Sequence, residues 1–136
     1  MVKGLLADND VRRQVEVLLH IFETEAWREV WRHLNIQLLS FEILGIPRSA
    51  SDADLWRQCQ NREVILITAN RNDDGPESLE STIRAFNKAN NLPVFTLANP
   101  KRLLDDRDYA ERVAERLLEY LLEIDTIRGT GRLYIP

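Results

Sequence analysis

Val64-Ile65-Leu66-Ile67-Thr68 is the stretch of sequence that decides the fold. Its residues are apolar or β-branched with no polar alternation, which predicts a strand buried on both faces, as at the centre of a parallel sheet. Polar turn residues follow at 69–75 and end the strand. A sheet with such a strand at its centre needs helices on both of its faces.

Further strands and helices alternate on either side of this central strand. Strands are expected at 2–7, 36–41 and 93–97, helices at 11–22, 24–34, 51–61, 76–90 and 105–125, and an extended tail at 133–136. This alternation predicts a parallel sheet covered on both faces. In such folds ligands bind beyond the carboxyl ends of the strands, so the residues that follow each strand are the first candidates for function.

The composition is that of an ordinary globular protein. Its 136 residues predict one domain, 1–136, in which 105–136 are a C-terminal helix and the extended tail. No apolar run approaches the ~20 residues of a membrane helix, and the first residues turn acidic too early for a signal peptide. The single cysteine, Cys59, excludes an intramolecular disulfide. We therefore expect a cytoplasmic protein without a membrane partner. The net charge of −4 argues against non-specific coating of DNA but allows a local nucleic-acid site.

Acidic and amide side chains gather where the predicted strands end or a helix begins. They are Asp8 and Asp10 after the first strand, Asp52 and Asp54 at the start of a helix, and Asn70, Asn72, Asp73 and Asp74 after the central strand. Clustered carboxylates repel one another, and Mg²⁺ or Mn²⁺ reverses that effect because hard cations prefer oxygen ligands. With a phosphate as a further ligand, such a site can activate water for attack at phosphorus.

Each of these groups also has an ordinary structural explanation. Residues 8–10 are compatible with a strand-to-helix turn, and residues 72–75 have the composition of a turn. Asp52 and Asp54 suit the first turn of a helix, where the helix dipole favours negative charge. Their order along the chain is more specific than any one group alone.

That order resembles PIN-like nuclease domains. Residues 5–11 (LLADNDV) resemble the family's first strand, which ends in a metal-binding aspartate. Residues 51–56 (SDADLW) resemble the second acidic motif, at a helix start, and residues 64–73 (VILITANRND) resemble the third, a strand followed by Thr-x-Asp-x-Asp. The resemblance spans residues 2–100 and is to the compact subgroup related to the toxins of toxin–antitoxin pairs.

The resemblance implies a three-layer α/β/α sandwich with a mainly parallel central sheet, and a hydrolase that cleaves RNA phosphodiester bonds with Mg²⁺ or Mn²⁺. By position in the motifs, Asp8, Asp52 and Asn70 are the catalytic candidates. The candidate metal ligands are Asp8, Asp10, Asp52 and Asp73, and Arg71 on the loop after the central strand is the candidate phosphate-binding residue.

Asn70 departs from the family pattern, which has an aspartate at that position. An amide oxygen can ligate a cation but carries no net charge, so the site binds a hard ion more weakly unless Asp73 or Asp74 compensates. The alternative hypothesis is a degenerate, non-catalytic PIN-like module that binds a protein or RNA partner. A receiver-like regulator is a weaker alternative, because no acceptor aspartate ends a third strand.

The expected partners are RNA, an antitoxin-like protein and a second copy of the chain. PIN-like domains commonly dimerise, and the three tryptophans together with residues 133–135 offer more apolar candidates for a surface than a monomer needs. These residues therefore predict a homodimer.

Overall fold

The computed structural model describes residues 1–72 and 74–136, and a sheet of five parallel strands forms its centre. The strands are β1 (Gly4–Ala7), β2 (Gln37–Leu39), β3 (Val64–Thr68), β4 (Val94–Leu97) and β5 (Arg132–Ile135). Their spatial order is β2-β1-β3-β4-β5, with Leu5 opposite Ile65 in the central pair. The expected parallel sheet, with 64–68 near its middle, is therefore confirmed.

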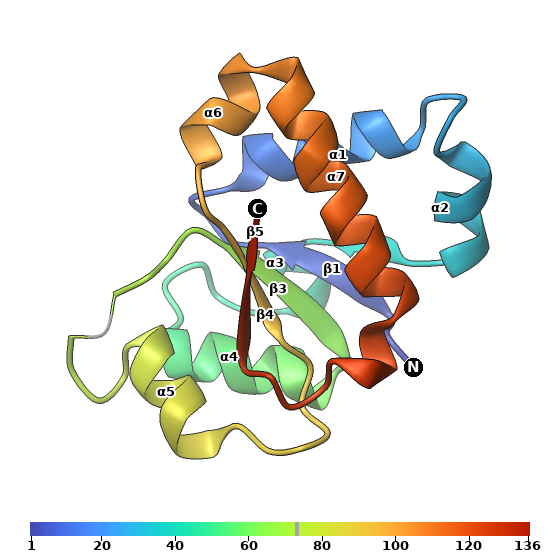
Figure 1. The fold of residues 1–136 in the computed structure, drawn as a ribbon. Helices are drawn as coiled ribbons and strands as arrows, with labels where there is room; N and C mark the ends of the chain where they lie inside the picture. Colours follow the sequence, from blue (N-terminus) through green and yellow to red (C-terminus); the bar gives the residue numbers. More distant parts are fainter. Residues whose placement is uncertain (73) are drawn as a thin grey trace.

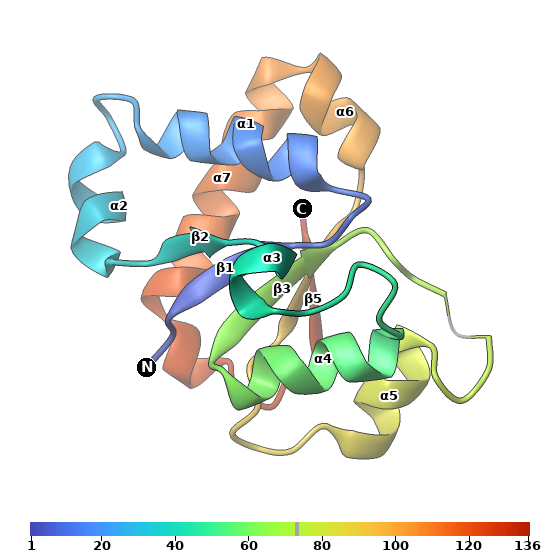
Figure 2. The ribbon, with the colours of Figure 1, turned by 180° about the vertical axis from the view of Figure 1, so that it is seen from behind.

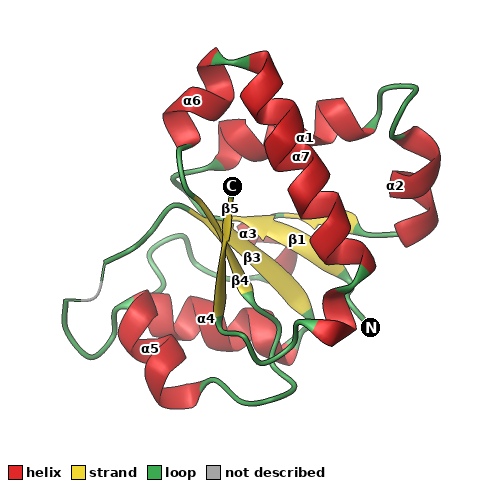
Figure 3. Cartoon of the chain, viewed as in Figure 1, coloured by secondary structure: helices red, strands yellow, loops and turns green. Residues whose placement is uncertain are grey.

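Helices cover both faces of the sheet (Figure 1), as the view from behind also shows (Figure 2). On one face lie α1 (Arg12–Phe22), α2 (Arg28–Leu34), α6 (Pro100–Asp105) and α7 (Arg107–Leu122), and on the other lie α3 (Phe41–Leu44), α4 (Asp52–Asn61) and α5 (Leu79–Phe86). A 3₁₀ turn, Ile124–Thr126, follows α7. The three layers of helix, sheet and helix confirm the expected α/β/α sandwich (Figure 3). Among the described residues, no helix combines the length and the apolar character needed to cross a membrane.

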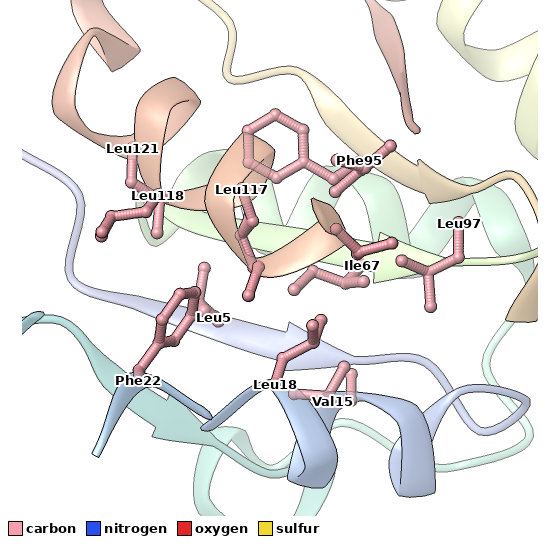
Figure 4. Close-up of a cluster of buried hydrophobic side chains, with 14 of the residues drawn as sticks. Leu5, Val15, Leu18, Phe22, Ile67, Phe95, Leu97, Leu117, Leu118 and Leu121 are labelled. Carbon is pink, nitrogen blue, oxygen red and sulfur yellow. The ribbon is translucent and has the colours of Figure 1, made fainter. Parts of the chain in front are cut away.

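Alternate strand residues supply the two halves of the core. Leu5, Ile65 and Phe95 face α1 and α7, whereas Leu6 and Leu66 face α3, α4 and α5. Figure 4 shows the first half, in which side chains of the strands meet those of the two long helices. Fully burying one such side chain stabilises the fold by about 1.5–3 kcal/mol, so the two clusters together fix the sheet between its helix layers.

Gly4 lets β1 and β2 approach closely. A Cβ atom at this position would lie 2.6 Å from the Gln37 carbonyl oxygen and 2.7 Å from Leu39 Cδ1. Any larger residue would therefore push the two strands apart.

Several elements differ from the sequence-based expectations. The expected tail at 133–136 is largely strand β5, which pairs with β4 from Val94–Arg132 to Leu97–Ile135. The helix expected at 76–90 is α5 alone, because the Ser78 hydroxyl caps its start and Asn87 is extended. The strand expected at 36–41 ends at Leu39, since Ser40 caps the short helix α3. Helices α3 and α6 were not expected.

The order of the strands reverses beside β1. The chain leaves β1 for β2 on one side and then returns to form β3 on the other. The carboxyl ends of β1 and β3 therefore flank the point at which parallel α/β folds bind ligands. Asp8 follows β1, and Asn70 lies just after β3, so two of the candidate residues reach this point.

Candidate functional site

Asp8 is held in a fixed position at the end of β1. Its Oδ2 accepts a hydrogen bond from the hydroxyl of Thr68 at 2.8 Å, and its Oδ1 accepts one from the Asn9 amide at 2.8 Å. Its own amide donates to the Ile67 carbonyl oxygen at 2.8 Å, which continues the β1–β3 pairing. Thr68 is fully buried, so the carboxylate of Asp8 is oriented by a rigid neighbour.

Asp52 joins three segments of the chain. It is the first residue of α4, whose start is capped by the Ser51 hydroxyl. Its Oδ2 accepts hydrogen bonds from Asn70 Nδ2 at 2.9 Å and from the Leu79 amide at 3.2 Å. The carboxylate thus sits against the first turn of α5, where the helix dipole favours a negative charge.

Asn70 uses both ends of its side-chain amide. The Nδ2 group donates to Asp52, while Oδ1 accepts from the Asn72 amide at 2.9 Å. Its backbone amide donates to the Thr68 hydroxyl oxygen at 3.0 Å. The oxygen that a cation would need therefore faces the loop of Asn70 itself. In this arrangement the side-chain amide of Asn70 orients the carboxylate of Asp52.

Asp10 lies close enough to the other two carboxylates to interact with their charges. Partial withdrawal of its carboxyl from water raises its pKa above 3.8, and the charges of Asp8 and, to a smaller extent, Asp52 raise the pKa further. The backbone N–H of Ala69 counters this effect by hydrogen bonding to the carboxylate. Three carboxylates from the β1 loop and α4 therefore share this edge of the sheet.

Asp8 and Asp52 could supply two carboxylate ligands to a divalent cation only if a ligand from outside the protein completed its coordination. Within residues 1–72 and 74–136, no group of three or more His, Cys, Asp or Glu side chains could hold a metal ion. Asp8 and Asp52 are nevertheless oriented by hydrogen bonds, as metal-binding carboxylates usually are. Mg²⁺ is often held by one or two carboxylates together with phosphate and water. Asp73, the fourth expected ligand, lies outside the described residues.

Two open depressions on this side of the molecule are lined by residues of the candidate site other than Asp8. Asp10 lines one of them together with Arg12 and Arg13. Asp52 lines the other together with Asn72 and Asp74. A long or branched ligand could therefore contact both depressions from the carboxyl edge, whereas neither is an enclosed pocket.

Arg71, the expected phosphate-binding residue, is held against the neighbouring strands. Its Nη2 donates to the Ala98 carbonyl oxygen, and its guanidinium carbon lies 5.3 Å from the centre of the Tyr134 ring. Both contacts come from segments that follow or form β4 and β5. The side chain of Arg71 remains largely exposed, so its charge is accessible at this end of the sheet.

Arg132 is a residue near the site that the sequence did not indicate. Its Nη1 donates to the Asn70 carbonyl oxygen at 2.8 Å and to the Thr96 hydroxyl at 2.7 Å. Only 6% of its side chain is exposed. The contact spans 62 residues along the chain and depends on β5, so no local pattern could have revealed it.

Comparison with protein-family models, with curated proteins and with solved structures gives no match for this chain. A function for the carboxyl edge is therefore inferred from its residues and their geometry.

Proposed function

We propose that this protein is a ribonuclease that depends on Mg²⁺ or Mn²⁺ and cleaves RNA phosphodiester bonds at the carboxyl edge of its sheet. The observation that carries the proposal is that Asp8 and Asp52 both contact residues at the carboxyl end of β3, Asp8 through Thr68 and Asp52 through Asn70. The two carboxylates come from different elements, and each is oriented by hydrogen bonds. They lie where the strand order reverses between β1 and β3.

The residues of the site divide into ligands and orienting groups. Asp8 and Asp52 would supply carboxylate ligands to the cation, and Asp10 would add negative charge beside them; the cation would stabilise negative charge at the phosphorus when bound. Thr68 and Asn70 hold the carboxylates of Asp8 and Asp52 in place through their hydrogen bonds. The phosphate of the substrate supplies the ligands that the protein does not, so the cation binds tightly only together with RNA.

Arginines on this side of the molecule support a polyanionic substrate. Arg12 and Arg13 begin α1 and line the depression that contains Asp10. Arg71 lies on the loop after β3, on the other side of the switch point. Guanidinium groups bind phosphates through two parallel hydrogen bonds, so these residues are suited to neighbouring phosphates of one RNA strand.

A second candidate function is favoured by the bond between Asn70 and Asp52. A neutral amide that donates to Asp52 satisfies this carboxylate without a cation. On this proposal the protein is a non-catalytic PIN-like module that binds RNA or a protein such as an antitoxin. The two candidates differ in one measurable property, which is turnover of RNA in the presence of metal.

The homodimer and the cytoplasmic location stay predictions. Trp31, Trp56 and Ile135, which we expected to contribute to a dimer surface, are buried in the core of this chain. They therefore give the dimer no support. Sedimentation at tens of micromolar protein tests it, and a monomer at that concentration would contradict it.

Cleavage of a mixed pool of RNA by purified protein, with and without Mg²⁺ or Mn²⁺, tests the ribonuclease proposal. Cleavage should require the metal, stop with a chelator, and fall at least a hundredfold in Asp8→Asn and Asp52→Asn. Asp54→Asn is the matched control, because Asp54 lies in the same first turn of α4 but pairs with Arg57 instead of the site. Absence of metal-dependent cleavage by the wild type, or equal cleavage by wild type and Asp8→Asn, would contradict the proposal.

A further inference from the structure

We infer that Arg132 is a positioning residue, which reaches from the C-terminal strand β5 to hold the loop of Asn70 and, through it, the carboxylate of Asp52. The geometric part of this inference stands on its own, and its consequence for cleavage rests on the proposed function. Three observations support the inference: the contacts of Arg132, the unfavourable burial of its guanidinium group, and the hydrogen bonds that hold Asn70.

Arg132 connects the edge strand β5 to its neighbour β4 and to the loop that follows β3. It begins β5 opposite Val94 of β4, and its Nη1 atom bridges the Thr96 hydroxyl and the Asn70 carbonyl oxygen. Thr96 is fully buried, so the guanidinium contacts a rigid part of β4 on one side and the loop after β3 on the other. The charged group therefore acts as a clamp between the sheet and the site.

The burial of this guanidinium is unfavourable by itself. Its Nε lies 3.4 Å from Glu80 Oε1, without the geometry of a hydrogen bond, and neither Nε nor Nη2 has a hydrogen-bond partner among the described residues. Buried donors without partners destabilise a fold, and buried ion pairs are often no better than apolar residues of the same volume. A methionine would fill the same space without that cost. The fixed contact that Nη1 makes with the Asn70 carbonyl oxygen explains the residue better than stability does.

The contact with Arg132 completes the set of hydrogen bonds that hold Asn70 in place. Its backbone amide is held by Thr68, its side chain joins Asp52 to Asn72, and its carbonyl oxygen is held by Arg132. Loss of the third contact frees the peptide that follows Asn70. The amide of Asn70 then no longer has one fixed orientation toward Asp52, and the carboxylate loses a donor.

Amide hydrogen exchange, resolved by residue with NMR, measures the clamp without any assay of activity. The amides of Asn72 and Leu79 are suitable reporters, because each donates to one of the two linked side chains, Asn70 and Asp52. In Arg132→Met, both amides should exchange at least tenfold faster relative to the Leu66 amide in the centre of the sheet. Arg132→Lys, which keeps a charged donor, should restore exchange to within about threefold of the wild type.

Arg128→Met is the matched control. Arg128 is also largely buried, at 16% side-chain exposure, and binds Glu63, Asp125 and the Asn90 carbonyl oxygen at the opposite end of the sheet. It should change exchange throughout the molecule without singling out Asn72 and Leu79. Equal patterns for Arg132→Met and Arg128→Met, or no change in the two reporters, would overturn the inference. If Arg132→Met does not fold, Arg132→Lys is compared with Arg128→Lys instead. The exchange rates of the Asn72 and Leu79 amides should then rise only in Arg132→Lys, and by less than the tenfold expected for Arg132→Met.

Cleavage assays separate this inference from the proposed function. If the wild type cleaves RNA, Arg132→Met should lower kcat at least tenfold and leave KM within twofold, because the arginines that face solvent are unchanged. If the wild type does not cleave RNA, the proposed function fails, and the exchange of Asn72 and Leu79 still decides whether Arg132 positions the loop.

Discussion

Asn70 donates its side-chain amide to Asp52, with Nδ2 and Oδ2 2.9 Å apart. At this distance a carboxylate in place of the amide would face Asp52 with a like charge. The amide instead satisfies one carboxylate oxygen and removes the repulsion that a divalent cation would otherwise relieve. If the proposed metal site exists, the identity of residue 70 should therefore affect both the stability of the free protein and its affinity for metal.

Replacement of Asn70 by Asp should strengthen metal binding and weaken the metal-free protein. A charge pair ~4 Å apart at an effective dielectric near 20 is worth about 4 kcal/mol before desolvation. Desolvation and repulsion between carboxylates offset much of this, so we expect about a tenfold gain in Mn²⁺ affinity, or about 1.4 kcal/mol. Calorimetric titration with Mn²⁺ measures the gain. The Tm of the variant should fall without metal and recover when Mn²⁺ is added.

Asn72→Asp is the control for this experiment. Asn72 lies in the same loop, but its side-chain oxygen accepts from the Asp74 amide, whereas the side-chain amide of Asn70 donates to Asp52. It should change Mn²⁺ affinity much less. If Asn70→Asp binds Mn²⁺ no better than the wild type and melts at the same temperature with and without metal, residue 70 does not face a metal site, and the non-catalytic module becomes the better proposal.

Thr68→Val should destabilise the protein by about 1–3 kcal/mol, although the two side chains have nearly the same shape. The hydroxyl of Thr68 donates to Asp8 and accepts from the Asn70 amide, and valine leaves both groups without this partner. Urea unfolding measures the change. Thr82→Val is the control: its hydroxyl donates to the Ser78 carbonyl oxygen, which keeps the Thr82 amide as a donor. Equal losses in the two variants would contradict the role of Thr68.

Asp106 should make the protein sensitive to acid. The backbone N–H of Tyr109 and, to a smaller extent, the side chain of Arg102 lower the pKa of Asp106 below 3.8, because they favour its charged form. Its contribution to stability is therefore complete above pH 3.8 and is lost as the pH falls through the lower pKa of the folded state. Asp106→Asn keeps an acceptor at the start of α7 but does not titrate. The Tm of the wild type should exceed that of the variant at neutral pH, and the two should converge in acid. A constant difference at every pH would contradict this.

Cys59 should react with thiol reagents only when the protein opens. The side chain is 1% exposed, and burial, with a smaller contribution from the charge of Asp8, raises the pKa of the thiol to about 12. The reactive thiolate is therefore scarce at pH 8. Labelling with a chromogenic disulfide should be complete within minutes in concentrated guanidinium chloride. In native buffer it should be limited by unfolding, and rapid labelling of the native protein would contradict the burial of Cys59.

The elements that could be predicted from the sequence are those with a strong local pattern. Strand β3 was predicted with its observed bounds, because five apolar or β-branched residues specify a buried strand wherever it pairs. Helix α7 was predicted within a few residues from its long apolar stripe. Strand β5 was interpreted as a tail, because its short sequence becomes a strand only through pairing with β4. Helices α3 and α6 are too short to show a period.

The candidate site was predictable in its location but not in its hydrogen bonds. Parallel strands end at one edge, which is why residues after β1 and β3 could be expected to lie close together. The orientation of Asn70 depends on two partners, Asp52 and Asn72, and on a clamp from Arg132 far along the chain. The bond from the Asn72 amide is a local turn contact, but the contacts with Asp52 and Arg132 span 18 and 62 residues and follow from no local pattern. The structure is needed to distinguish an amide that offers oxygen to a cation from one that donates to a carboxylate.

The division of the core into two clusters gives each helix layer its own fluorophore. Trp31 stacks on Phe22, with ring centres 4.8 Å apart, and Trp27 packs nearby in the same cluster, whereas Trp56 lies in the cluster on the opposite face of the sheet. The Trp56→Phe variant keeps only Trp27 and Trp31, so its fluorescence reports on the layer of α1, α2 and α7. The double variant Trp27→Phe, Trp31→Phe keeps only Trp56, so its fluorescence reports on the layer of α3, α4 and α5. Two optical signals with one common midpoint mean that the sheet binds the layers into a single cooperative unit, whereas two different midpoints mean that one layer detaches while the other persists.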